Sequence, residues 1–178
     1  MEYTIIRSRR KTLAIEITPQ GNVLVRAPLR MTKRDIQRFL ESKQDWITAH
    51  LAKLPVVTPL TAEEHNALIR SAKEALPAKV AFFARELGVT FGRITIRSQR
   101  SRWGSCAASG NLSFNCLLLL APEEVQDYVV VHELCHRKEM NHSPAFWAEV
   151  ERVMPDYRNR KAWLKEHGAS LLARLPLL

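Results

Sequence analysis

The sequence predicts an α+β fold, and three observations carry this prediction. Residues 11–27 alternate apolar and polar side chains on both sides of a turn, which is typical of a β-hairpin. Residues 61–87 repeat apolar side chains at helical spacing. Residues 93–115 contain two further alternating segments, which predict a second pair of strands. Strands and long helices are therefore expected in the same chain.

The first part of the chain is expected to hold the hairpin and one helix. Its strands are predicted at 11–18 and 23–27, with turn-forming residues between them. Thr32 is suited to cap a helix, and apolar residues recur at helical spacing from there to residue 51. A short connector with two prolines follows at 54–60. This connector predicts the end of the first structural part.

The sequence accordingly predicts two parts, 1–60 and 61–178. The first is the hairpin and helix, packed on the core, and the second is the core itself. Thr61 followed by Glu64 forms a capping-box pattern that opens the first helix of the core. Pro77 is expected to kink or split that helix, because proline lacks the N–H that an α-helix needs.

Length and composition exclude several classes of protein. The chain has 178 residues, of which 46% are hydrophobic and 25% charged, as in ordinary soluble domains. The longest apolar run, at 116–122, is far shorter than the roughly 20 residues of a membrane span, so no membrane partner is expected. Basic residues near the start do not suit a secretory signal. Three cysteines without a CxxC pair do not suit a disulfide framework, and we therefore expect a cytoplasmic protein.

Charge points to a class of partner. The chain carries 27 Lys and Arg against 18 Asp and Glu, a formal net charge of +9. Such an excess favours contact with polyanions. Nucleic acid is therefore an expected partner, through the basic surface.

Residues 132–136, HELCH, carry the most informative motif. They match the HExxH pattern on a helix expected to begin at Pro122. Residues four apart lie on one helix face, so the imidazoles of His132 and His136 can reach one tetrahedral ion. Glu133 is offset to the side of that pair, where it can accept a proton from water activated by the ion. The motif predicts a zinc site with Glu133 as the general base.

His142 is the predicted third ligand. Catalytic zinc commonly takes three protein ligands and keeps one position for water. A continuing helix would turn His142 away from His136, but Asn141 tolerates a left-handed turn, and Ser143 with Pro144 is typical of a new helix start. We therefore expect the chain to turn back and bring His142 to the ion. The alternative third ligands are Glu149 and Glu151.

Several segments together resemble a known family. HELCH and NHSPAFW, preceded by RSRWGSCAASGNLSFN and PEEVQDYVVV, resemble the YgjP-like family of metal-dependent hydrolases, a branch of the zincin metallopeptidases. The likeness is densest over 97–168. It implies a zincin-like core, with a small mixed sheet, the HExxH helix and C-terminal helices. It also implies that His132, His136 and His142 are the metal ligands and that Glu133 is the catalytic glutamate.

The RWGSC segment supplies the candidate substrate-binding residues. Because it resembles a motif of the same family, Arg102, Trp103 and Ser105 are predicted to brace the site or to contact substrate. The strand at 112–115 has two interpretations: an exposed sheet edge to which an extended peptide can add, or an ordinary covered strand. Tyr157 is a weak candidate for stabilising an oxyanion, and packing is the alternative.

Three functions remain in competition at this point. The leading one is a zinc-dependent metallopeptidase, whose substrate is a peptide. The second is a metal-dependent nucleoside triphosphate pyrophosphohydrolase, which the family resemblance allows and the basic charge favours. The third is a nucleic-acid-associated protease similar to SprT-like proteins. The chain has no zinc knuckle of paired cysteines, which disfavours this third hypothesis.

Overall fold

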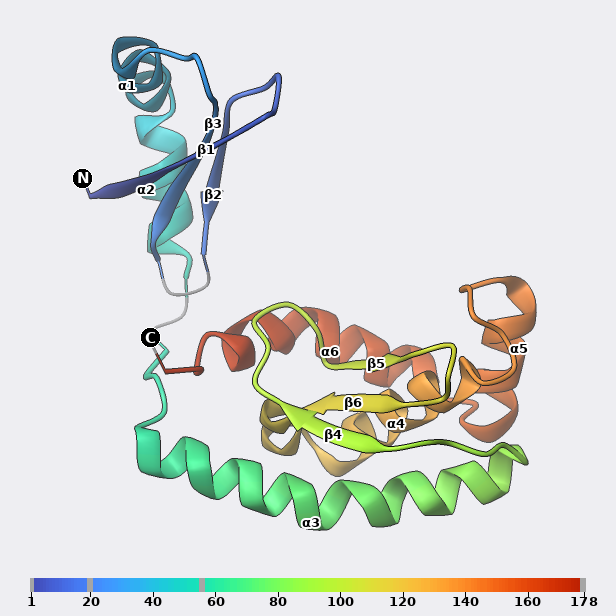
Figure 1. Cartoon of the computed structure of the whole chain (residues 1–178). Helices are drawn as coiled ribbons and strands as arrows, with labels where there is room; N and C mark the ends of the chain where they lie inside the picture. Colours follow the sequence, from blue (N-terminus) through green and yellow to red (C-terminus); the bar gives the residue numbers. More distant parts are fainter. Residues whose placement is uncertain (1, 19–20, 55–56, 177–178) are drawn as a thin grey trace. The chain divides into compact units, whose positions relative to one another are not determined.

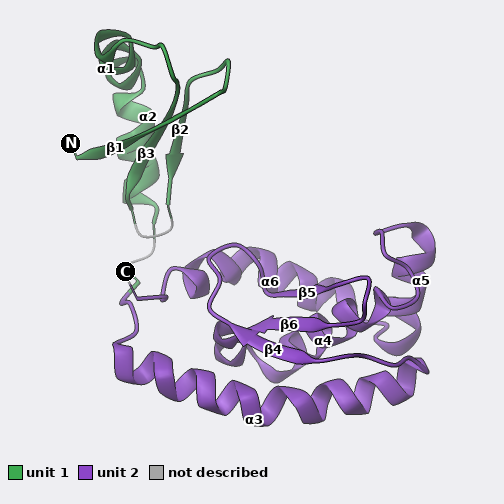
Figure 2. Cartoon of the chain, viewed as in Figure 1, with its two compact units in different colours: residues 1–57 green, residues 58–178 purple. Residues whose placement is uncertain are grey.

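The computed structural model describes residues 2–18, 21–54 and 57–176 (Figure 1). The chain divides into two compact units, Met1–Val57 and Thr58–Leu178 (Figure 2). The sequence predicted a boundary between residues 60 and 61, three residues after the observed one. The predicted packing of the first part on the second stays a prediction. Residues 19–20 of the predicted turn and 55–56 of the predicted connector lie outside the described residues. None of the described helices has the length and apolar character that crossing a membrane requires.

Unit 1 contains a three-stranded sheet with the order β1-β3-β2. Its strands are β1 (Tyr3–Ser8), β2 (Ala14–Ile17) and β3 (Val23–Pro28). β2 and β3 are antiparallel, with Ile15 opposite Val25, which confirms the predicted hairpin. β1 runs parallel to β3 and was not predicted. All six of its side chains are exposed or only partly buried, and its apolar face consists of Tyr3 and Ile5, which is too short a pattern to mark a strand.

The single helix predicted for unit 1 is wrong, because the structure has two. They are α1 (Lys33–Ser42), capped by Thr32 as predicted, and α2 (Gln44–Ala52). The break falls at Lys43, whose φ of −114° and ψ of 9° leave the helical region. Apolar residues continue at helical spacing across the break, so the pattern fits one helix as well as two. Both helices contribute to one small core, which consists of Val23, Val25, Ala27, Ile36, Leu40 and Ile47.

Unit 2 begins with the long helix α3 (Ala62–Leu87), whose two ends follow the sequence pattern. The Thr61 hydroxyl accepts from the Glu64 amide at 3.2 Å, and the Glu64 carboxylate accepts from the Thr61 amide at 2.8 Å. These two bonds form the predicted capping box. Gly88 ends the helix with a φ of 66°, a left-handed conformation that glycine adopts without strain.

Pro77 does not split α3, so that part of its prediction is wrong. The helix runs unbroken through the proline. An interior proline costs a helix about 3 kcal/mol. Leu76 and Val80 lie on either side of it and are fully buried in the core. We attribute the continuity of the helix to this packing, which offsets the lost hydrogen bond.

The sheet of unit 2 has the order β4-β6-β5. β4 (Ile94–Arg97) is parallel to β6 (Leu112–Asn115), which confirms the predicted pairing, and β5 (Gly104–Cys106) is antiparallel to β6. β5 lies between the two segments predicted as strands and was not itself predicted. β6 is therefore central, and its interpretation as an exposed edge is wrong. The strand order decides this, since β6 has neighbours on both sides and Phe114 is almost fully buried.

One short 3-10 helix and three α-helices complete unit 2. They are η1 (Cys116–Leu120), α4 (Glu123–Cys135), α5 (Pro144–Val153) and α6 (Tyr157–Leu172). α4 contacts α3, α5, α6 and β5, so it lies at the centre of the unit (Figure 1). Most of its residues are buried, as expected for a helix with neighbours on several sides. The α+β class is thus confirmed, with a small mixed sheet, the motif helix and C-terminal helices.

Candidate metal centre and active site

Helix α4 positions the first part of the site. His132 and Glu133 lie in its last turn, and His136 is the first residue after it. The helix begins one residue later than predicted, with Pro122 in the N-cap position. Val125 and Val129, seven and three residues before His132, are buried on the interior side of the helix. The core therefore determines which way the first two histidines face.

The chain turns back after His136, as the sequence predicted, but the left-handed turn suggested at Asn141 is wrong, because no described residue other than glycine has a positive φ. The amides of Arg137 and Lys138 bond to carbonyls of the last helical turn, and regular structure then stops. Ser143 caps α5 by accepting from the Phe146 amide at 3.3 Å, and Pro144 is the first helical residue. Between these two helix ends His142 returns to the site.

The three histidines converge. Nε2 of His142 lies 3.0 Å from Nε2 of His132, and one nitrogen from each ring of His132, His136 and His142 lies within 4.8 Å of the others. Ligand nitrogens of a tetrahedral zinc ion, each at 2.0–2.1 Å from the metal, are separated by roughly 3.3 Å. The observed spacing therefore suits a single ion between the three rings.

The hydrogen bond made by His136 and the burial of His132 also suit a metal site. Nδ1 of His136 lies 3.0 Å from the carbonyl oxygen of Glu139, which can only accept, so Nδ1 donates and Nε2 keeps its lone pair. Burial, together with the neighbouring His136 and His142, lowers the pKa of His132 to about 3. Burial, His136 and Lys161 also lower the pKa of His142. Burial thus favours the neutral imidazole form of His132 and His142, which is the form that binds metal ions.

Phe146 supports all three rings and was missed by the sequence reasoning. Its fully buried ring has its centroid 4.9 Å from that of His132, 4.6 Å from His136 and 4.9 Å from His142. Trp147 stacks beside it on His142, at 5.8 Å. The available signal was the placement of two aromatic residues in the first turn of the helix that follows His142.

Replacing Phe146 with alanine is expected to destabilise the metal-free protein by roughly 3–5 kcal/mol, because it leaves a cavity in a packed core. Urea unfolding of the full chain measures this loss. Phe82→Ala is the matched control, since that side chain is 50% exposed and its loss should cost little. Equal losses in the two variants would contradict the supporting role of Phe146.

Glu133 is buried against strand β5. Its exposed fraction is 6%, and burial raises the pKa of its carboxyl to about 7. A Cβ at Gly104 would lie 2.6 Å from Cγ and 2.7 Å from Oε1 of Glu133. Only glycine allows β5 to approach this closely. This contact explains the glycine of the RWGSC segment, a role that sequence reasoning did not assign.

A pocket of about 250 Å³ opens beside Glu133. Arg102 and Trp103 line it from the segment before β5, and Leu164 lines it from α6. Trp103 also packs on α6, where its Nε1 would lie 3.3 Å from a Cβ at Gly168. Ser105 pairs with Ser113 within the sheet and is not among the described residues that line this pocket. Two of the three predicted substrate residues therefore border the pocket.

The weaker sequence candidates are engaged elsewhere. Glu149 accepts from Lys138 at 2.8 Å, and Glu151 pairs with Arg158 at 3.6 Å, which leaves His142 as the residue that meets the other two histidines. Tyr157 is buried, and its ring stacks on Trp147 at 5.3 Å. Packing therefore accounts for Tyr157.

Three imidazoles beside a buried carboxylate are the arrangement that a metal-dependent hydrolase requires. A family model described as "YgjP-like, metallopeptidase domain" matches residues 11–66 and 57–167. The chain therefore belongs to the YgjP-like family, and at family level it is a metal-dependent peptidase. Family membership implies a metal ion.

The chain is similar to the metallopeptidase zymogen abylysin of Pyrococcus abyssi, with 24% identity and a TM-score of 0.46. The match covers 51% of this chain and 92% of that chain. No curated protein matches the sequence.

Proposed function

We propose that the protein is a zinc-dependent peptidase in which His132, His136 and His142 hold the ion and Glu133 is the general base. The convergence of three imidazoles next to a buried carboxylate carries this proposal. Imidazole nitrogen suits zinc, and a set of three protein ligands is typical of catalytic zinc. A zinc ion held there supplies Lewis-acid polarisation of the scissile carbonyl and lowers the pKa of water.

Glu133 moves the proton in this proposal. Its buried carboxylate accepts a proton from the attacking water and then returns it to the leaving amine. Burial raises the pKa of this carboxyl, which makes it a better base than an exposed glutamate. The contact with Gly104 restricts where the carboxylate can lie.

The free edge of β5 favours a peptide as the substrate. The Trp103 carbonyl accepts from the Asn115 amide at 2.8 Å, and the Ala107 amide donates to the Asn111 carbonyl at 2.9 Å. Main-chain groups alternate along an antiparallel strand, so those of Gly104 and Cys106 point away from β6. An extended peptide adding to this edge would place its backbone beside Glu133.

The pocket beside Glu133 favours an apolar substrate side chain. Trp103, Val129 and Leu164 supply apolar lining, and Arg102 adds a cationic group. We therefore expect cleavage next to an apolar residue. The nucleotide hypothesis instead predicts that Arg102 contacts a substrate phosphate. The nucleic-acid hypothesis predicts salt-sensitive DNA binding that is retained in Glu133→Gln.

A hydrolase screen tests the proposed function. The zinc-loaded protein is incubated with a diverse peptide mixture and, separately, with a panel of nucleoside triphosphates, and products are identified by mass spectrometry. We expect peptide cleavage that stops when the metal is chelated. Pyrophosphate release from a nucleotide without any peptide cleavage would overturn the proposal in favour of the pyrophosphohydrolase.

Gly104→Ala is expected to lower kcat by roughly 10²-fold while zinc content stays unchanged, because the new methyl group displaces the Glu133 carboxylate. Gly92→Ala is the matched control. A Cβ there would lie 2.5 Å from Oδ1 of Asn111, a similar crowding of a polar side chain away from Glu133. Equal activity in the two variants would remove the assigned role of Gly104.

A further inference from the structure

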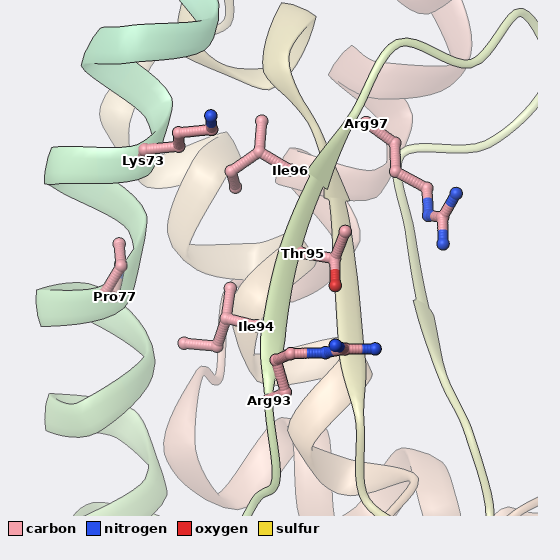
Figure 3. Close-up of a pocket in the computed structure, with 7 residues that line it drawn as sticks. All are labelled: Lys73, Pro77, Arg93, Ile94, Thr95, Ile96 and Arg97. Carbon is pink, nitrogen blue, oxygen red and sulfur yellow. The ribbon is translucent and has the colours of Figure 1, made fainter.

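A larger groove lies at the opposite edge of the unit 2 sheet from β5. It has a volume of about 510 Å³ and follows strand β4, with helix α3 on its other side (Figure 3). None of the metal-site residues lines it. It is therefore distinct from the catalytic pocket, and the proposed peptidase chemistry does not use it.

The main chain of β4 is open toward this groove. The Arg93 carbonyl accepts from the Leu112 amide at 2.9 Å, so alternation directs the main-chain groups of residues 93, 95 and 97 toward β6. Those of Ile94 and Ile96 point the other way. No described residue outside the sheet hydrogen-bonds to the main chain of Ile94 or Ile96. Such an edge can accept another strand.

Cationic side chains flank the open edge. Figure 3 shows Arg93 and Arg97 extending from one side of β4 and Lys73 of α3 on the other, near Ile96. Within the described part of the chain, none of these three side chains forms an ion pair, and the groove has no acidic lining residue. Their positive charge is therefore available to a ligand. Arg93 and Arg97 are four residues apart, which corresponds to roughly 13 Å along a strand.

We propose that this groove binds an extended acidic segment of a partner polypeptide, which adds to β4 as a further strand. The open main chain of Ile94 and Ile96 would pair with the backbone of that segment. Acidic side chains at alternate positions would face Arg93 and Arg97 on one side of the sheet. Lys73 is available to residues on the other side.

Polypeptide fits this groove better than single-stranded nucleic acid does. Nucleic acid is typically held by aromatic side chains on which the bases stack, and the described lining has none. A strand edge, by contrast, presents the donors and acceptors that a peptide backbone needs. The charge supplies the preference for acidic sequences.

The proposal is tested by fluorescence anisotropy with a labelled nine-residue peptide that alternates valine and glutamate. The full chain carrying Glu133→Gln is used so that the peptide is not cleaved. We expect saturable binding that weakens as salt is added. Two changes should each weaken it at least tenfold: the double variant Arg93→Glu and Arg97→Glu, and N-methylation of alternate peptide amides.

Controls separate strand addition from general attraction. Arg85→Glu with Lys165→Glu makes the same change in net charge at two exposed positions and should leave binding unchanged. Binding that tolerates N-methylation, or that survives reversal of Arg93 and Arg97, would overturn the proposal. The proposal would also be overturned if single-stranded DNA bound more tightly than the peptide and if this DNA binding were lost in the same double variant. None of these readouts depends on hydrolysis, so the proposed peptidase activity and this groove can fail separately.

Discussion

Glu133→Gln is expected to lower kcat for peptide hydrolysis by roughly 10²–10⁴-fold, the usual contribution of a general base. Glutamine keeps the size of the side chain but cannot take up the proton of the attacking water. The pocket beside it is unchanged, so KM should change little. Steady-state kinetics on a peptide found in the screen measures both constants. Retention of more than half of the wild-type kcat would remove Glu133 from the reaction.

The fold of this variant can be checked independently. In the metal-free protein, burial raises the pKa of Glu133 from 4.5 in the unfolded chain to about 7 in the folded one. The unfolded chain therefore loses this proton more readily, and the free energy of unfolding falls as pH rises from about 4.5 to 7. Glu133→Gln removes this loss of stability. Metal-free Glu133→Gln should therefore be more stable than the wild type at pH 8, by roughly 3 kcal/mol at most, and the difference should vanish near pH 4. Urea unfolding at the two pH values measures it, and lower stability at pH 8 would contradict the account.

His136→Ala is expected to reduce zinc affinity by more than roughly 100-fold. Loss of a residue that only hydrogen-bonds to a metal ligand already costs roughly 10–100-fold, and His136 is itself a proposed ligand. The variant removes one of the three converging imidazoles and leaves only His132 and His142 to hold the ion. Competition with a fluorescent zinc chelator measures the affinity of the full chain.

His167→Ala is the control for this loss, because His167 is exposed on α6 and stacks on Trp163. Its zinc affinity should equal that of the wild type. Equal affinity in all three proteins would show that the three-histidine cluster is not the zinc site.

The motif residues could be placed from the sequence because their chemistry depends on local spacing. His132 and His136 are one helical turn apart, so any helix brings their rings together. His142 could be predicted from the stop signals around it, since Ser143 and Pro144 are typical of a helix start. These predictions required no knowledge of how the rest of the chain packs.

Residues that join the site through tertiary contacts could not be found in this way. Gly104 lies far from Glu133 in the sequence, and its importance appears only once β5 is seen against the carboxylate. β5 itself has three residues, too few for alternation to mark it as a strand. Likewise, the order β4-β6-β5 makes 112–115 a central strand, and strand order is not encoded in local periodicity.

Zinc K-edge X-ray absorption of the protein loaded with one equivalent of zinc tests the central claim most directly. We predict three imidazole nitrogens at about 2.0–2.1 Å and one oxygen ligand completing a four-coordinate site. His142→Ala should reduce the imidazole count to two. A sulfur ligand at about 2.3 Å, or an unchanged spectrum in His142→Ala, would contradict the assignment of His132, His136 and His142 as the metal ligands.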